Sequence, residues 1–258
     1  MTHVLLCFSG TGNSAHMAQY LSQAMEDCNI MQLTDVMEGK RDFTVPEKLG
    51  FVFPTYVEMP PEIIIRFIRE QLATQDLSPL GYLYIVTDGG ARHPTYCHKA
   101  IEAELSKAGA YASYYGYVSM PDNYLRIKGK ATNSKTIAKA DKKLKIIADE
   151  IKNEKLKPPA FRPLPRLFIN LFGSLASRFN VASHFTVTDQ CTGCGRCYRS
   201  CPAGNISMQD GKPTFLQGCQ NCFGCISYCP AKAILYKGKE RTARYTFPDG
   251  PFYIEYRK

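Results

Sequence analysis

Eight of the eleven cysteines in this chain fall between Cys191 and Cys229. They form two runs of the same pattern, Cys-x-x-Cys-x-x-Cys-x-x-x-Cys-Pro, and each cysteine of the second run lies 28 positions after its counterpart in the first. Zinc sites usually take cysteines as separated pairs, whereas three successive cysteines at this spacing suit an iron–sulfur cube with four thiolate ligands. The segment therefore predicts two [4Fe–4S] clusters, which we favour over structural or disulfide-bonded cysteines.

Residues 185–236 resemble bacterial two-[4Fe–4S] ferredoxins over their whole length. In that family the fourth cysteine of each run ligates the other cluster. The resemblance implies that the ligands of the first cluster are Cys191, Cys194, Cys197 and Cys229. It implies that those of the second cluster are Cys219, Cys222, Cys225 and Cys201. The three other cysteines have no such spacing, and Cys7 is expected to be a small core residue.

A second candidate site is a loop rich in glycine and hydroxyl groups, between a predicted strand and a predicted helix. It consists of Ser9, Gly10, Thr11, Gly12, Asn13 and Ser14. Backbone N–H groups at a helix N-terminus bind anions, and glycines let a ligand approach closely. The loop lacks the lysine of a nucleoside-triphosphate loop, and its match to a dinucleotide fingerprint, with Asp35 as the acidic residue, is weak. Neutral donors of this kind suit a phosphate monoester such as that of FMN.

The loop resembles the phosphate loop of the flavodoxin family, whose pattern is matched by Ser9, Thr11, Gly12 and Ser14. Flavodoxin-like proteins enclose the isoalloxazine ring with two further loops, after their third and fourth strands. The resemblance assigns this role to Pro54, Thr55, Tyr56, Val57, Glu58, Met59, Thr87, Asp88, Gly89 and Gly90. It adds Asn123 and Tyr124 from the segment after the fifth strand.

Three of these residues are candidates for the faces of the flavin ring. Tyr56, Met59 and Tyr124 have aromatic or polarizable side chains, which stack well on a flat heterocycle. The chain has no tryptophan, so it departs from the many flavodoxins that stack a tryptophan on the flavin.

Alternating strand and helix patterns position these loops. Apolar runs predict strands at 3–8, 29–33, 49–54, 82–87 and 111–118, and helical periodicity predicts helices at 13–26, 61–72, 94–107 and 134–152. The alternation predicts an α/β fold with a doubly wound, five-stranded parallel sheet that is flavodoxin-like. A small α+β two-[4Fe–4S] ferredoxin-like domain follows it. Ligands of such a sheet bind beyond the carboxyl ends of the strands, where the loops named above begin.

Composition divides the chain into four parts. We expect a flavodoxin-like FMN-binding domain at 1–153, a proline-rich linker with an amphipathic helix at 154–183, the ferredoxin-like domain at 184–238 and a tail at 239–258. The apolar stripe at 167–179 is expected to pack between the domains, with a membrane-surface helix as the alternative. The tail carries several aromatic residues and is expected to fold back on one of the domains.

The net charge of +9 is concentrated between Arg126 and Lys157. Lysines occupy the outer face of the predicted helix at 134–152, where a solvated surface is the simpler interpretation and a docking patch for an acidic redox partner the functional one. No motif indicates nucleic-acid binding. The sequence shows neither a leader pattern nor a run of about 20 apolar residues. We therefore expect a cytoplasmic protein without a membrane span, in a compartment where disulfides do not persist.

Nearly the whole chain resembles the flavodoxin–ferredoxin fusion family of anaerobes, which implies FMN and two [4Fe–4S] clusters. A flavin exchanges one or two electrons and a cluster exchanges one. We predict an electron-transfer iron–sulfur flavoprotein that moves low-potential electrons between FMN, the clusters and redox partner proteins.

Two other functions are open, although an electron carrier is favoured over an enzyme. The first alternative is an FMN-dependent reductase of a small organic substrate that receives electrons through the clusters. His93, Tyr56 or Tyr124 could then supply a proton. The second is a binding module whose cofactors serve only as structural staples. Direct use of a nicotinamide is disfavoured, because no residues remain for a separate dinucleotide domain.

Overall fold

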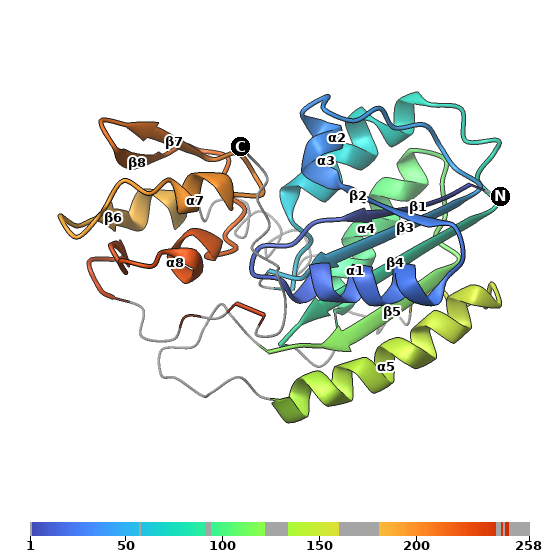
Figure 1. The fold of residues 1–258 in the computed structure, drawn as a ribbon. Coiled ribbons are helices and arrows are strands. Elements are labelled where there is room, and N and C mark those ends of the chain that lie inside the picture. Colours follow the sequence, from blue (N-terminus) through green and yellow to red (C-terminus); the bar gives the residue numbers. More distant parts are fainter. Residues whose placement is uncertain are drawn as a thin grey trace.

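The computed structural model describes residues 2–56, 58–90, 94–121, 134–159, 181–240, 244, 246 and 247. Three predicted binding residues, Val57, Asn123 and Tyr124, lie outside these ranges, as do His93 and the apolar stripe at 167–179. Two parts of the described chain lie side by side, a larger one built on a five-stranded sheet and a smaller one with two short sheets (Figure 1).

The larger part contains the predicted parallel sheet. Its strands are β1 (His3–Cys7), β2 (Cys28–Gln32), β3 (Lys48–Pro54), β4 (Tyr82–Gly89) and β5 (Tyr114–Ser119). They are arranged in the order β2-β1-β3-β4-β5, and all neighbouring strands are parallel. This order is that of a flavodoxin-like doubly wound fold, with a topological switch point between β1 and β3. The predicted fold class is confirmed.

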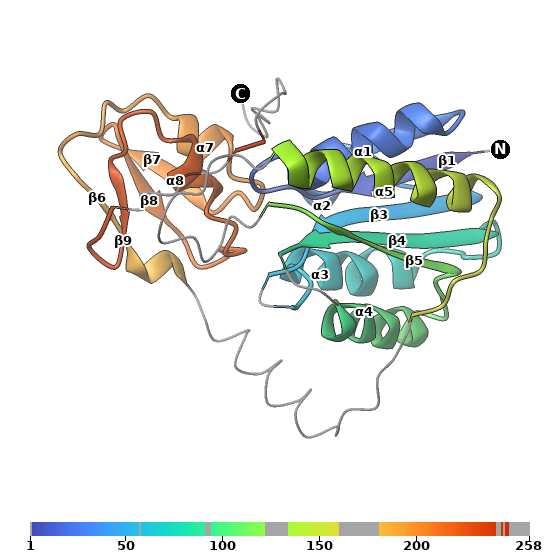
Figure 2. The same cartoon turned by 90° about the horizontal axis from the view of Figure 1, so that it is seen from below.

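Helices cover both faces of the sheet, as buried parallel strands require (Figure 2). On one face lie α1 (Asn13–Ala24) and α5 (Ser134–Lys152), which share a core with the sheet. On the other lie α2 (Leu33–Met37), α3 (Glu62–Glu70) and α4 (Thr95–Lys107). A short 3-10 turn, Leu72–Thr74, follows α3.

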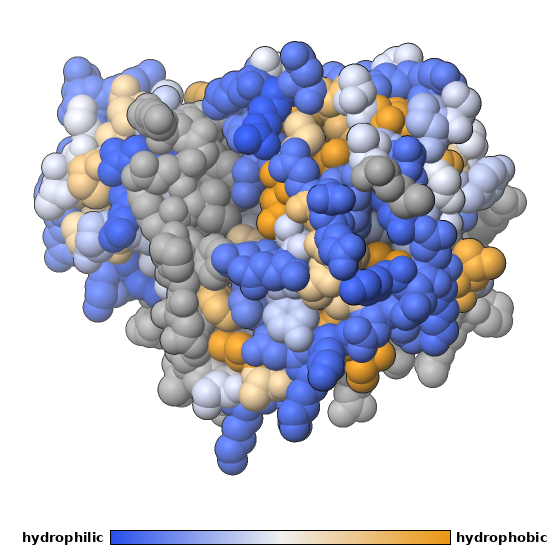
Figure 3. All heavy atoms as spheres, turned by 45° about the vertical axis from the view of Figure 1, so that its right-hand side comes forward, coloured by the Kyte–Doolittle hydropathy of each residue, from blue (hydrophilic) through white to orange (hydrophobic). Residues whose placement is uncertain are grey.

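Helix α5 is amphipathic as predicted. Its buried residues include Ile137, Leu144 and Ile147, while Lys139 and Lys143 are exposed. Figure 3 shows that the surface on this side of the larger part is mainly hydrophilic. In the described ranges, no helix has both the length and the apolar character needed to cross a bilayer.

The smaller part is built from two copies of one strand–helix–strand unit. The first copy contains β6 (Phe185–Val187), α7 (Arg196–Arg199) and β7 (Ile206–Gln209), after the 3-10 turn Val181–His184. The second contains β8 (Lys212–Phe215), α8 (Gly224–Tyr228) and β9 (Ile234–Tyr236). Strand β6 pairs with β9 and β7 pairs with β8, both antiparallel, so each strand pairs with the other copy. The cysteine repeat is therefore also a structural repeat.

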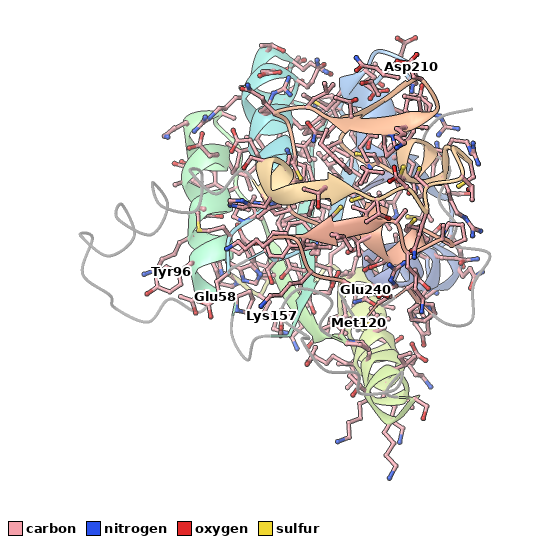
Figure 4. All side chains as sticks on the ribbon, turned by 90° about the vertical axis from the view of Figure 1, so that its left-hand side faces the viewer. Glu58, Tyr96, Met120, Lys157, Asp210 and Glu240 are labelled. Carbon is pink, nitrogen blue, oxygen red and sulfur yellow. The ribbon has the colours of Figure 1, made fainter. Side chains whose placement is uncertain are left out.

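The two copies share one small core. Its apolar members include Phe185, Ile206, Phe223 and Ile234, and buried cysteines pack among them. Figure 4, viewed from this side of the molecule, shows sulfur atoms between the strands and Asp210 at the outer turn that joins β7 to β8. A core this small, built partly from cysteine side chains, is typical of domains that depend on a metal centre for stability.

Candidate cofactor sites

A pocket opens beyond the carboxyl ends of β1, β3 and β4, where a sheet of this type binds its ligands. It is lined by Ser9, Gly10, Thr11, Asn13, Ser14, Pro54, Thr55, Tyr56, Asp88, Gly89, Gly90 and Pro121. All of these except Pro121 belong to the predicted flavin-binding set. The described residues of that set that do not line the pocket are Gly12, Glu58, Met59 and Thr87.

The phosphate loop, residues 9–14, enters the pocket with its polar side chains buried. Ser9, Thr11 and Ser14 are at most 2% exposed. Gly12 has φ +104°, a left-handed conformation that favours glycine, and it occupies the N-cap position of α1 without a side-chain cap. Its N–H donates to the Ser9 hydroxyl at 3.2 Å. The loop therefore presents neutral donors and a helix N-terminus to the pocket, which fits a bound phosphate group.

The end of β4 brings a buried carboxyl group to the phosphate loop. Asp88 is 2% exposed, and its Oδ2 accepts a hydrogen bond from the hydroxyl of Ser14. Burial raises the pKa of Asp88 to about 7, and the opposing effect of the Ser14 hydrogen bond is smaller. Asp88 can therefore change its protonation state near neutral pH while lying beside an anion-binding loop.

The loop after β3 is fixed to the end of β4. The backbone N–H and the hydroxyl of Thr55 both donate to the carbonyl oxygen of Asp88, at 2.7 and 3.0 Å. A Cβ on Gly89 would overlap the Thr55 hydroxyl, so this position needs a glycine. Tyr56 and Met59 exchange two backbone hydrogen bonds across a tight turn. Tyr56 lines the pocket, whereas Met59, the second described candidate for a ring face, does not.

The first predicted cysteine set surrounds one hollow in the smaller part. Burial raises the pKa of Cys197 to about 11, and three neighbouring thiols act in the same direction: Cys229, Cys191 and Cys194. All four cysteines line the hollow. Four thiols around one hollow fit a cube, whose four iron atoms each take one thiolate.

The second predicted set also comes together. Burial raises the pKa of Cys222, and Cys201 and Cys219 raise it further. Burial and the neighbouring thiols Cys222, Cys201 and Cys219 also raise the pKa of Cys225. Backbone N–H groups point at two of the sulfur atoms, from Asn205 to Cys201 at 3.3 Å and from Asn221 to Cys219 at 3.4 Å. Amide donors to ligating sulfurs are a usual feature of iron–sulfur sites, and a bound metal would deprotonate these thiols.

The second cysteine set lies directly against the flavin pocket. A Cβ on Gly10 would overlap Cys222, lie 2.8 Å from the hydroxyl oxygen of Tyr56 and lie 3.1 Å from the Cys222 sulfur. A Cβ on Gly224 would lie 2.6 Å from the carbonyl oxygen of Gly10. Nearby, the side-chain oxygen of Gln220 accepts a hydrogen bond from the backbone N–H of Ile63 at 3.2 Å. We call these contacts the glycine seam.

Two described tail residues each contact one part of the chain, Arg244 the smaller and Phe247 the larger, as the expectation that the tail folds back requires. The guanidinium of Arg244 donates to the carbonyl oxygen of Cys229 at 2.6 Å. The backbone N–H of Phe247 donates to the carbonyl oxygen of Thr11 at 2.9 Å, and its ring stacks on His16 at a centroid distance of 4.2 Å. Sequence reasoning did not assign these residues, and the aromatic content of the tail was the only signal.

Comparison with known proteins identifies the smaller part. Residues 185–230 match the 4Fe-4S dicluster domain family. Over 54 residues the chain is 41% identical to an uncharacterized ferredoxin of Methanocaldococcus jannaschii, a match that covers 19% of this chain and 70% of the relative. The chain belongs to the dicluster ferredoxins. A flavodoxin-like domain precedes the cluster domain in this chain, so the chain is a flavodoxin–ferredoxin fusion.

Several solved structures resemble the larger part of the chain. The Trp repressor binding protein of Bacillus subtilis has a TM-score of 0.39 and 16% identity, and the match covers 57% of this chain and 96% of that one. A flavoprotein of Lactobacillus acidophilus in complex with FMN has a TM-score of 0.33 and 14% identity, with 45% and 92% coverage. A Streptococcus pneumoniae flavodoxin has a TM-score of 0.36 and 14% identity, with 59% and 98% coverage. The fold assignment rests on the strand order itself.

Proposed function

We propose that this chain is an electron-transfer iron–sulfur flavoprotein that exchanges low-potential electrons between FMN, two [4Fe–4S] clusters and redox partner proteins. The observation that carries the proposal is the glycine seam, where Cys222 of one cysteine set lies against Gly10 of the phosphate loop. Two cofactor sites in direct contact suit transfer between them. A reducing compartment such as the cytoplasm keeps the thiolates available to iron.

The residues of the pocket fit FMN. The phosphate loop offers buried hydroxyls and the N-terminus of α1 to the phosphate, and the aromatic side chain of Tyr56, which lines the pocket, would suit a flat ring. When bound, the flavin supplies exchange of one or two electrons. The chain's part is to hold it, exclude water from it and keep it beside the second cysteine set.

The cysteine sets fit two clusters in the crossed arrangement. We assign Cys191, Cys194, Cys197 and Cys229 to the first cluster, and Cys201, Cys219, Cys222 and Cys225 to the second. Each set is gathered from both copies of the repeat, in the same way as the paired strands. A cluster bound in this way would join the two copies and stabilise the small core.

Anaerobic purification followed by cofactor analysis tests the proposal. We expect about one FMN and about eight iron atoms per chain, as one flavin site and two cubes require. A sample that contains zinc and no extractable flavin would contradict the proposal. Reduced protein should then pass its electrons to a one-electron acceptor such as a viologen. Reoxidation only by a small organic substrate would instead support the FMN-dependent reductase.

A further inference from the structure

We propose that the two clusters have fixed places in the electron path: the set containing Cys222 serves the flavin pocket, and the set containing Cys194 serves the external partner. This inference rests on the proposed function and adds the order of transfer to it. The order runs from partner to first cluster, second cluster and flavin, or in reverse when the partner is an acceptor.

The inner end of this path is defined by burial and contact. Cys201, Cys222 and Cys225 are all buried, and Cys222 belongs to the same apolar core as Tyr56 and β3 of the larger part. A Cβ on Gly10 would lie 3.1 Å from the Cys222 sulfur and 2.8 Å from the Tyr56 hydroxyl, so both groups lie beside Gly10. Electron tunnelling slows exponentially with distance, so the cluster held here is favourably placed to exchange electrons with a flavin in the pocket.

The outer end is defined by exposure. Cys194 is exposed, and so are its neighbours Thr192 and Gly193, whereas Cys222 is enclosed by Phe223 and Gly224, which are buried. A cluster bound by Cys194 would have one edge near solvent, where a partner protein can reach it. Cys197 of the first set and Cys225 of the second share the small core of this part, so the crossed ligands would hold the two clusters close together.

Each step moves one electron. An external one-electron donor of low potential is oxidised as the first cluster is reduced from the 2+ to the 1+ state. That cluster returns to 2+ as the second is reduced, and the second returns to 2+ as the flavin accepts the electron. Two such passages, with protons taken from water, reduce the flavin by two electrons.

The seam offers a variant that separates the cofactors without removing a ligand. In Gly224→Ala the new Cβ would meet the Gly10 carbonyl at 2.6 Å, so the two backbones must move apart. Gly218→Ala is the matched control: it lies beside Cys219, and its new Cβ would make only an ordinary contact with Asn205 at 3.5 Å. Gln220→Leu is a second test variant, which loosens the seam by removing the hydrogen bond to Ile63.

The experiment reduces anaerobic, fully loaded protein with reduced methyl viologen and follows the clusters by rapid-freeze EPR and the flavin by absorbance. In Gly224→Ala and Gln220→Leu we expect both cluster signals to appear at the wild-type rate and the flavin to be reduced several-fold more slowly. Flavin fluorescence, which a neighbouring cluster quenches, should rise in the same variants without any turnover. Gly218→Ala should match the wild type in each measurement.

The outer end is tested with Thr192→Trp, whose bulky ring would cover the exposed edge beside Cys194. We expect the EPR signal of the first cluster to appear more slowly. The rate of electron transfer from the clusters to the flavin should be unchanged. Two results would overturn the order: wild-type flavin kinetics and fluorescence in both seam variants, or flavin reduction before either cluster signal in the wild type. Protein that binds no FMN or no iron would instead refute the proposed function.

Discussion

The hydroxyl of Ser14 donates a hydrogen bond to the buried carboxyl of Asp88, which joins the end of the phosphate loop to the end of β4. A carboxylate at this place would repel a phosphate in the loop, whereas a protonated carboxyl would not. The hydrogen bond thus links the anion site to a group whose pKa burial raises to about 7.

Affinity for FMN should therefore fall as the pH rises through about 7, because Asp88 loses its proton in that range. Binding of FMN and protonation of Asp88 are linked. For each unit by which bound phosphate raises the pKa of Asp88, the affinity for FMN is about tenfold weaker above this pH range than below it. Asp88→Asn should remove most of this pH dependence and bind FMN more tightly than the wild type above pH 7. Titration of cluster-loaded, flavin-free protein with FMN from pH 6 to 8.5, followed by fluorescence, measures both effects. If the affinity for FMN fell equally with pH in the wild type and in Asp88→Asn, the role of Asp88 would be contradicted.

The same group affects the stability of the flavin-free protein. Since burial raises the folded-state pKa from 3.8 to about 7, the contribution of Asp88 is fully present below pH 3.8 and is lost as the pH rises from there to about 7. Asp88→Asn should therefore gain stability relative to the wild type as the pH rises from about 4 to about 7, and the difference should stay constant above that.

Gly12→Ala should lower FMN content more than it lowers iron content. At φ +104° an added Cβ is strained by about 1–2 kcal/mol, and here it would also lie 2.8 Å from the Cβ of Phe247. Gly39→Ala is the matched control, because Gly39 is also left-handed, with φ +67°, but has open space around its Cβ position. The flavin and iron contents of the two variants separate the two effects, because Gly39→Ala introduces backbone strain without a clash with the tail. A Gly39→Ala protein that also loses its flavin would indicate a general loss of stability.

Glu104 should stabilise the larger part more than Glu70 does. Its side chain is 10% exposed, Arg69 binds both of its oxygens at 2.7 and 2.9 Å, and Lys107 adds a contact at 2.8 Å. Glu104→Gln should cost about 1–3 kcal/mol in the free energy of unfolding at pH 7. Glu70→Gln, which removes the exposed pair with Arg66, should cost less than about 1 kcal/mol. Urea denaturation followed by helical circular dichroism makes the comparison.

The sign of the pH effect follows from the lowered pKa of Glu104, which the Arg69 hydrogen bonds bring to about 2. The contribution is fully present above pH 4.5 and is lost as the pH falls towards 2. The difference between Glu104→Gln and the wild type should therefore shrink over this range. A difference that stays constant would mean that the carboxylate charge is not what stabilises the fold.

Cys194→Ser should lower the iron content to about half, since it removes one ligand of one cube. Because the ligands are crossed, Cys229→Ser should remove the same EPR signal as Cys194→Ser, although Cys229 belongs to the second run. Cys28→Ser is the control: Cys28 is half-buried near His3, at the far end of β2, and should leave all iron in place. If Cys229→Ser and Cys222→Ser instead removed the same signal, the crossed assignment would be wrong.

The sheet could be predicted from sequence because its strands are apolar runs buried on both faces. Strand ends were less accurate: 111–118 was predicted as a strand, but Tyr111 is 67% exposed and β5 begins at Tyr114, where pairing with Tyr84 starts. The five-residue α2 was missed because so short a helix leaves no periodic pattern.

The phosphate loop and the cysteine sets could also be predicted, since their chemistry is visible in local spacing. The partners that depend on how the two parts dock could not. Gln220 and Phe247 lie in segments without periodicity, and their contacts with Ile63 and Thr11 join residues far apart in the chain. Pro121 was not assigned to the pocket, because its contribution there is a carbonyl that accepts from Asn13 at 3.0 Å, and sequence does not mark a backbone acceptor.

The hydrogen bond from Phe247 to Thr11 also sets a sequence of events during synthesis. The phosphate loop precedes both cysteine runs in the chain, so it receives this partner only after both runs have been translated. A flavin that arrives on the nascent chain meets a phosphate loop without this hydrogen bond, whereas a flavin that arrives at the finished protein meets a loop already bonded to Phe247.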